Sequence, residues 1–444
     1  MYRAFLIILN KLISFVCHMA HKNGSVYPGS ITFNLNRRIL TKIKYPKYFI
    51  VVTGSSGKGS TCNLIYNALT NLGYKVVFNN SGSNGVRALC TIILNNCNIF
   101  GRMKADVLLL EADERHIHMA FPKDCITHLV ITNITRDQPA RSGTVDSIGE
   151  FIFRKITNYT KLIINGDDPV VNTFATNTKC HITKYGIDKT TSSFKKPVIN
   201  NLDHQYCPKC HTKLVYNFYH YGQMGDYYCP NCNFKRNPLK YVAQDVDLNN
   251  QKVKINKNDI HITKDQLYTV YATLAAYATL SEIGINEKDI IKELNNKELK
   301  SKRGNIYHYQ DQPFIMLESK NENALSYYQS LKYITNTKGH KSVILGFDNV
   351  SRRYKYNDLS WLYDVEFELL NDKNIDKIFV IGRFKYDILN RLELANIDHK
   401  KIVLVEELTD LKTLLKKIGT PIYTMVCFDM TYNIKQILKE DLHD

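Results

Sequence analysis

The stretch VVTGSSGKGST, residues 51–61, decides the fold, because it joins the end of a β-branched run to a glycine-rich turn and a lysine. An apolar run covers 47–54, and a helical pattern follows from 60 to 72. A strand, a glycine loop and a helix in this order predict a phosphate-binding loop, in which backbone N–H groups and the helix N-terminus bind phosphate oxygens. A Gly/Ser turn that binds no nucleotide is the alternative.

We expect this loop to bind ATP together with Mg²⁺. A hydroxyl residue usually follows the lysine and binds the magnesium ion. Gly59 occupies that position here, so we assign the magnesium oxygen to Ser60. The complete set of expected nucleotide-binding residues in the loop is Gly54, Ser56, Gly57, Lys58, Gly59, Ser60 and Thr61.

Further short apolar runs follow the loop, at 74–80, 105–113, 128–133 and 161–166. Each ends in polar residues or glycine, which is typical of parallel strands that reach the carboxyl edge of a sheet. The pattern predicts an open α/β sheet with its ligands at that edge. Glu111, Asp113 and Glu114 end one of these runs, and we take Glu111 as the candidate magnesium carboxylate. A solvated strand end is the alternative.

Two Cys-x-x-Cys pairs, separated by eighteen residues, are formed by Cys207, Cys210, Cys229 and Cys232. This spacing predicts a structural Zn²⁺ site, because four thiolates complete a tetrahedral shell and leave no open position. Four reduced cysteines without metal are the alternative. We place an inserted zinc ribbon at 203–237. The other seven cysteines are scattered singly, which indicates a reducing, cytoplasmic setting.

The apolar runs divide the chain into three expected parts. Residues 1–45 form an amphipathic helix and a lead-in, 46–298 a central ATP-binding domain, and 299–444 a smaller α/β domain with strands near 341–348, 376–383, 401–407 and 421–429. A strongly amphipathic helix is expected at 265–285. Asn10, Lys11 and His18 interrupt the first apolar segment, so we expect it to pack on the protein rather than span a membrane. Contact with a membrane surface is the alternative.

The chain has 444 residues and a net charge of +17, with an ordinary apolar content of 44%. This composition excludes wholesale disorder and favours anionic ligands without choosing among them. Lys235 and Arg236 beside the cysteines are too few to predict binding of nucleic acid, so we expect none. In the last part, Asp358, Ser360, Trp361 and Asp364 form a D-x-S-W-x-x-D motif. Asp358 could be catalytic or could cap a helix that begins near Ser360.

The order of these motifs resembles the Mur ligases, which are ATP-dependent enzymes that form amide bonds in peptidoglycan synthesis. The resemblance covers nearly the whole chain and includes NNSGSN (79–84), LLLEADERHI (108–117) and INGDDPVV (164–171). The cysteine insertion and the D-x-S-W motif resemble the branch of the family that amidates a lipid-linked muropeptide. The resemblance implies a Mur-ligase-type central parallel sheet.

It also implies a two-protein reaction. This chain would bind ATP and lipid II at the inner face of the membrane, and would activate the α-carboxylate of the D-glutamate in the stem peptide as an acyl phosphate. A partner glutaminase, GatD, would bind the C-terminal domain and supply ammonia, which gives D-isoglutamine. Asp358 would complete the partner's Cys-His pair.

Departures from the family pattern keep two alternatives open. The GKGS sequence resembles the loop of folylpolyglutamate synthases, which favours a ligase that joins another amine to a different carboxylate. Gln266, Thr269 and Ala272 replace Gly and Asn residues of the family, and Ala140 replaces an acidic one. These changes would suit a catalytically weakened scaffold.

Overall fold

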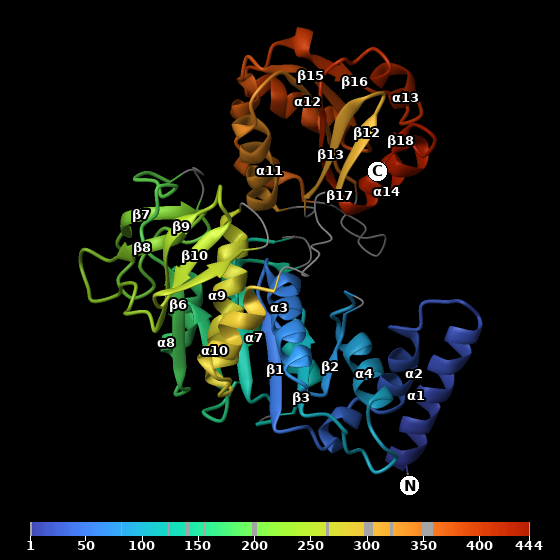
Figure 1. Ribbon diagram of the computed structural model, residues 1–444, viewed down its shortest axis with the longest axis vertical. Coiled ribbons are helices and arrows are strands. Elements are labelled where there is room, and N and C mark those ends of the chain that lie inside the picture. The colour runs from blue at the N-terminus through green and yellow to red at the C-terminus, as the bar shows by residue number, and fades with distance from the viewer. Residues whose placement is uncertain are drawn as a thin grey trace. The chain divides into compact units, whose positions relative to one another are not determined.

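The computed structural model describes residues 2–80, 82–122, 124–137, 142–154, 156–197, 202–262, 266–296, 305–319, 323–348 and 358–443. The chain divides into two compact units, one formed mainly by 1–300 and the other by 301–444. Each unit consists of a sheet covered by helices (Figure 1). The departure at Ala140 lies outside the described residues.

The first unit is built on a nine-stranded sheet with the order β11-β10-β9-β6-β5-β4-β1-β3-β2. The strands from β2 to β9 in this order are parallel, whereas β10 and β11 are antiparallel. This confirms the predicted open α/β sheet. The strands are β1 (Tyr48–Thr53), β2 (Val76–Phe78), β3 (Val107–Glu111), β4 (His128–Ile131), β5 (Lys161–Asn165), β6 (Ile182–Ile187), β9 (Tyr241–Asp247), β10 (Lys252–Ile255) and β11 (Asn258–His261).

Helices cover both faces of this sheet, because the central strands are apolar on both sides. Phe49 and Val51 of β1 pack in one core, while Ile50 and Val52 point to the opposite face. The first core contains residues from six helical segments, with α2 (Tyr27–Leu35) packed beside them. The six are α1 (Tyr2–Met19), η1 (Ile39–Lys42), α4 (Val86–Asn95), α5 (Ile117–Ala120), α7 (Val145–Phe153) and α8 (Pro169–Thr176). The helices α3 (Lys58–Asn71), α9 (Leu267–Glu282) and α10 (Glu287–Leu294) contact one another and the sheet.

The structure of α9 differs from the expected amphipathic helix. All of its residues from Thr269 to Leu280 are buried, so this stretch has no polar, solvated face. The reason is its position, because α9 contacts the strands β5, β6 and β9 as well as the helices α3 and α10. A helix that is covered on all sides is apolar all round.

The inner face of α1 is anchored to the first unit. Leu6 and Ile7 are fully buried, and the buried Asn10 donates hydrogen bonds to Thr91 O (3.2 Å) and Asn95 Oδ1 (2.8 Å) of α4. Within the described residues, α1 is the single helix whose length and composition would suffice to cross a membrane. Its packing on α2 and α4 nevertheless makes it part of the unit's surface layer.

The second unit is built on a seven-stranded sheet with the order β16-β15-β14-β17-β13-β12-β18. Four of its strands match the predicted runs, namely β14 (Lys341–Gly346), β15 (Ile375–Ile381), β16 (Ile402–Leu404) and β17 (Ile422–Cys427), and they are parallel. The antiparallel pair β12 (Asn305–Tyr309) and β13 (Gln312–Ser319), with β18 (Leu442–His443), extends the sheet. The helical segments are α11 (Ala324–Asn336), η2 (Ser360–Asp364), η3 (Phe367–Asn371), α12 (Lys385–Leu394), η4 (His399–Lys401), α13 (Asp410–Leu415) and α14 (Phe428–Ile437).

His128, at the start of β4, makes the stability of the first unit depend on pH. Burial disfavours the charged imidazole, and with a further contribution from Lys161 it lowers the pKa of His128 to about 4. The unfolded chain therefore binds more protons than the folded one between about pH 4 and 6.5, so stability is full above pH 6.5 and falls as the pH drops. We expect His128→Gln to remove up to about 2 kcal/mol of this pH dependence between pH 5 and 7, measured by urea unfolding. The exposed His399→Gln is the control, and equal pH slopes in both variants would contradict the prediction.

Candidate functional site

Two glycines shape the loop between β1 and α3. Gly54 has a φ of 127°, and a Cβ atom there would lie 2.3 Å from Thr132 Oγ1 and 2.7 Å from the carbonyl oxygen of Asn133. Gly57, just before α3, has a φ of 81°. A side chain is therefore excluded at Gly54 by close contact and disfavoured at Gly57 by its left-handed backbone. Gly54 thus allows the loop to pack directly against Thr132 and Asn133 at the end of β4.

The end of β4 holds the loop in place. Asn133 Oδ1 accepts hydrogen bonds from the backbone N–H (3.0 Å) and the hydroxyl (3.2 Å) of Ser56. The Thr132 hydroxyl donates to Ser56 O (2.6 Å). Ser55 N–H donates to Asn133 O (2.9 Å), and the Ser55 hydroxyl donates to Thr135 O (2.9 Å). These bonds fix the loop before any ligand binds.

The ammonium group of Lys58 lies inside the loop. Lys58 is buried, and its Nζ donates to the carbonyl oxygen of Gly54 and to Glu114 Oε1, the latter at 2.7 Å. Glu114 is itself buried, so the ion pair is shielded from water. The lysine of the predicted phosphate-binding loop is thus held at the first turn of α3 by a carboxylate.

The three carboxylates after β3 have different surroundings. Glu111 is directed to the first turn of α3, because a Cβ atom at Gly59 would lie 3.2 Å from Glu111 Oε2. Asp113 accepts hydrogen bonds from Arg115, at 3.0 and 3.1 Å, and Glu114 pairs with Lys58. Glu111 therefore lies against Gly59 in the first turn of α3, whereas Glu114 reaches the same turn through Lys58.

The first turn of α3 also carries hydroxyl groups. Ser60 is partly exposed, whereas Thr61 is buried, and its Oγ1 has no hydrogen-bond partner among the described residues. Buried polar atoms are normally satisfied, so an orphaned oxygen at a helix N-terminus points to a ligand. Phosphate oxygens and Mg²⁺ fit this arrangement, because it combines helix N–H groups, an ammonium group, hydroxyls and a carboxylate.

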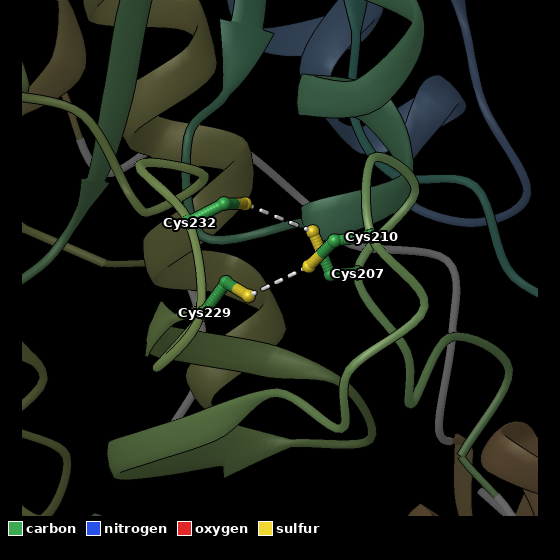
Figure 2. Close-up of side chains that lie close together, drawn as sticks. All are labelled: Cys207, Cys210, Cys229 and Cys232. Atoms are coloured by element: carbon green, nitrogen blue, oxygen red, sulfur yellow. Dashed lines mark hydrogen bonds between the residues drawn. The ribbon is translucent and has the colours of Figure 1, made fainter.

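The four predicted zinc ligands come together in the first unit. All four Sγ atoms lie within 4.8 Å of one another, with Cys207 and Cys232 at 3.5 Å and Cys210 and Cys229 at 3.4 Å (Figure 2). Four Zn–S bonds of about 2.3 Å place the sulfur atoms of a tetrahedron about 3.8 Å apart. The thiols therefore fit Zn²⁺ and leave no position for a substrate.

Each cysteine pair lies on a tight backbone turn. Cys207 N–H donates to Thr212 O (2.8 Å), and Cys229 N–H donates to Phe234 O (2.7 Å). In the first turn, His211 adopts a left-handed φ of 57°. These two turns aim the thiols at one point, which is how zinc ribbons present their ligands.

An ion pair that the sequence analysis missed joins the cysteine module to the sheet. The hairpin of β7 (Val215–Tyr221) and β8 (Met224–Tyr228) carries the second cysteine turn, and Arg236 follows it. Arg236 Nε lies 2.7 Å from Oδ1 of the fully buried Asp167, which follows β5. Asp167 Oδ2 accepts further hydrogen bonds from Tyr271 Oη (2.7 Å) of α9 and Ile187 N–H (2.8 Å). Arg236 is therefore an internal structural residue.

The next residue, Asp168, joins two strand ends. Its carboxylate caps α8 by accepting the N–H of Val170 (2.9 Å), and it also accepts the N–H of Ile134 (2.7 Å) after β4. Burial raises the pKa of Asp168 to about 7. The Asp-Pro pair at the start of α8 is a sequence signal for such a cap.

In the second unit, Asp358 has a defined structural contact. Its Oδ1 accepts a hydrogen bond from Ser360 N–H (2.9 Å), at the start of η2. Trp361 of η2 is buried, with its ring 4.9 Å from that of Tyr327. Arg391 fixes the end of η2 through hydrogen bonds to the carbonyl oxygens of Leu362 and Val365. The N-cap residue of η2 is Leu359, so Asp358 is not its N-cap; the bond from the Ser360 N–H, two residues further on, holds the Asp358 carboxylate in place.

Two family models match the chain. The Mur ligase middle domain matches residues 52–232, which include the loop, Glu111 and the four cysteines. The MurT ligase C-terminal domain matches residues 320–432, which include Asp358. The two matches follow each other along the chain.

Curated relatives carry the same combination. The chain is 29% identical to the MurT subunit of lipid II isoglutaminyl synthase (glutamine-hydrolyzing) from Staphylococcus aureus strain COL, over 89% of this chain and 88% of the relative. The corresponding Streptococcus pneumoniae R6 subunit is 26% identical over 89% of this chain and 87% of the relative. Among solved structures, a pseudomurein peptide ligase type C from Methanothermus fervidus has a TM-score of 0.66 at 19% identity, covering 91% of this chain and 80% of its own. MurF ligase from Thermotoga maritima in complex with ADP has a TM-score of 0.56 at 15% identity, and the match covers 93% of this chain and 83% of the MurF chain.

The cysteine cluster predicts that zinc and stability are lost together. We expect the purified protein to contain about one zinc per chain and Cys207→Ser to contain a small fraction of that. Because metal binding and folding are coupled, the melting temperature should fall by several degrees. Metal analysis and thermal unfolding test both points. Cys17→Ser, a cysteine outside the cluster, is the control, and unchanged zinc and melting temperature in Cys207→Ser would contradict the prediction.

Proposed function

This chain is a Mur ligase-family protein with a MurT-type C-terminal domain, and from that premise we propose that it is the ligase subunit of a lipid II isoglutaminyl synthase. It is an ATP-dependent ligase. The proposed reaction converts the α-carboxylate of the D-glutamate in the stem peptide of lipid II to an amide. The single observation that carries the proposal is the likeness to MurT subunits over 89% of the chain.

The geometry of the loop supports the use of ATP. Lys58 would neutralise the charge of the β- and γ-phosphates, and the N–H groups of Gly57, Gly59 and Ser60 would bind phosphate oxygens at the start of α3. Glu111 and Ser60 would hold Mg²⁺, which supplies charge neutralisation for phosphoryl transfer. Binding of the phosphates would require Lys58 to leave or share its contact with Glu114.

The chemistry explains the need for ATP. A carboxylate is a poor electrophile because its negative charge repels nucleophiles. Transfer of the γ-phosphoryl group to a carboxylate oxygen gives an acyl phosphate and ADP. Ammonia then attacks the acyl carbon and forms the C–N bond. The bond between the acyl carbon and the phosphate oxygen breaks, phosphate leaves with its electron pair, and one proton is released as the amide forms. The ammonia would come from glutamine through a partner glutaminase.

The partner would be the glutaminase GatD, bound to the second unit. The name of the S. aureus relative describes a subunit of a glutamine-hydrolyzing enzyme, which supports a second protein. Asp358 would orient the histidine of the partner's Cys-His pair, as an acidic residue does in other triads. Its contact with Ser360 N–H would keep the carboxylate in position.

We further propose a cytoplasmic protein at the inner face of the membrane, with a structural zinc ion. The cysteine cluster provides the zinc site, and no disulfide joins cysteines within the part of the chain that the structure describes, which fits a reducing compartment. Nucleic acid is not a proposed partner. Arg236, one of the two basic residues beside the cysteines, is neutralised internally by Asp167.

A second candidate is favoured by one observation. The GKGS sequence places Gly59 next to Glu111 and moves the hydroxyl to Ser60, as the likeness to folylpolyglutamate synthases implied. A ligase that joins an amino acid to a different carboxylate would use the same loop. Co-purification with a glutaminase distinguishes the two, because only the proposed synthase needs that partner.

Lys58 provides the test of nucleotide use. We expect Lys58→Ala to bind Mg²⁺-ATP about 100-fold more weakly than wild type, because a buried charge partner of the phosphates is lost. Calorimetry measures the affinity of each protein. Lys75→Ala, which removes an exposed lysine, is the control and should bind normally. Negligible binding of Mg²⁺-ATP by both wild type and Lys58→Ala would rule out the ligase reaction and support the alternative of a scaffold that does not use ATP.

Asp358 provides the test of the glutaminase partnership. We expect Asp358→Asn to reduce glutamine-dependent amidation by at least about 100-fold, because the partner's histidine loses its orienting carboxylate. Amidation with added ammonium salt should remain near the wild-type rate, and the complex should still form on size exclusion. Undiminished activity with glutamine would remove Asp358 from the catalytic role.

A further inference from the structure

The outward face of α1 is apolar. Six large side chains on it are between 53% and 64% exposed, namely Phe5, Ile8, Leu12, Phe15, Val16 and Met19. Exposed apolar residues occur singly on most proteins, but a continuous apolar surface marks an interaction site. We call this surface the outer face of α1.

Helical spacing puts these six residues on one side of α1. They follow one another at intervals of one, three or four positions, and the buried Leu6, Ile7 and Asn10 lie on the opposite side. Rotation of α1 about its axis would break the hydrogen bonds that Asn10 and Ser14 make to Asn95 of α4. The unit therefore holds the apolar side in contact with solvent.

The same part of the chain has a large excess of positive charge, because it contains no acidic residue. The first acidic residue of the sequence is Asp106, and thirteen Lys and Arg residues precede it, whereas the net charge of the whole chain is +17. Lys11 and Lys22 flank the outer face and are exposed, and Arg37 and Arg38 after α2 are exposed as well. Figure 1 shows α1, α2 and α4 side by side at one end of the first unit.

We propose that the outer face of α1 binds the surface of a bilayer that contains anionic phospholipids. An apolar helix face flanked by basic residues lies in the plane of such a surface, with its apolar side chains at the acyl boundary and its cations near the head groups. The basic residues around α1 complement the negative charge of the phospholipid head groups, which favours a bilayer surface as the binding partner. A second copy of the chain would bring two strongly basic, acid-free segments together, and their repulsion disfavours that interface.

The contacts of α1 also exclude a spanning helix. The buried Asn10 shares hydrogen bonds with α4 and accepts one from Thr32 of α2 (3.2 Å), so the helix stays attached to the first unit. An attached helix contacts the membrane from one side only. The proposal does not depend on the reaction proposed above, because it concerns binding to lipid and not amidation.

Vesicle flotation with the full chain tests the proposal. We expect the protein to float with vesicles of phosphatidylcholine containing 30% phosphatidylglycerol, and to bind vesicles of pure phosphatidylcholine much more weakly. Binding should weaken from 0.1 M to 1 M salt, because the screening length falls from about 10 Å to about 3 Å. Equal binding to both kinds of vesicle, or no binding to either, would overturn the proposal.

Two matched pairs of variants locate the surface. Leu12→Asp/Phe15→Asp should abolish flotation without a change in melting temperature, whereas Leu394→Asp, an equally exposed leucine of the second unit, should float normally. Lys11→Glu/Lys22→Glu should bind anionic vesicles at least about 25-fold more weakly, at about fivefold per charge removed. Lys373→Glu/Lys439→Glu gives the same charge change at exposed positions elsewhere and should bind normally. A lipid-free dimer that Leu12→Asp/Phe15→Asp dissociates would overturn the proposal in favour of a second copy.

Discussion

The parallel register of β1, β3 and β4 is the constraint on which the site depends. Val52 pairs with Glu111, and Thr53 pairs with Ile131, so the three strands end at the same edge of the sheet. The parallel register therefore places the loop after β1, the carboxylates at the end of β3 and the asparagine after β4 next to one another. A shift of one residue between these strands would turn Glu111 to the other face of the sheet and take its carboxylate away from α3.

A second group of contacts ties the remaining elements to this edge. Asp167 follows β5 and receives Arg236 from the cysteine module and Tyr271 from α9. Removing one member of a buried ion pair leaves an uncompensated charge, which costs about 3–5 kcal/mol. The metal-binding turns hold the hairpin that delivers Arg236, so the module acts as a brace for the sheet although it lies outside the proposed chemistry.

Local signals were enough to predict the parallel strands, the loop and the cysteine cluster, because each is encoded by residues close in sequence. The sequence singled out Glu111 among the three carboxylates at the end of β3, but it did not reveal that Asp113 pairs with Arg115 and Glu114 with Lys58. The ion pair of Arg236 with Asp167 could not be predicted, because the two residues lie far apart in the chain. The burial of α9 and the parallel pairing of β13 with β17 likewise depend on distant partners.

The narrow gap between Gly59 and Glu111 links the two positions. A threonine at position 59, where most phosphate-binding loops carry their hydroxyl, would bring its Cβ to 3.2 Å from Glu111 Oε2, so that carboxylate would have to move by a few tenths of an ångström. The hydroxyl of Ser60, one residue later, avoids this close contact. The position of the loop hydroxyl and the position of the Glu111 carboxylate are therefore coupled, and a substitution at either residue would displace the other side chain.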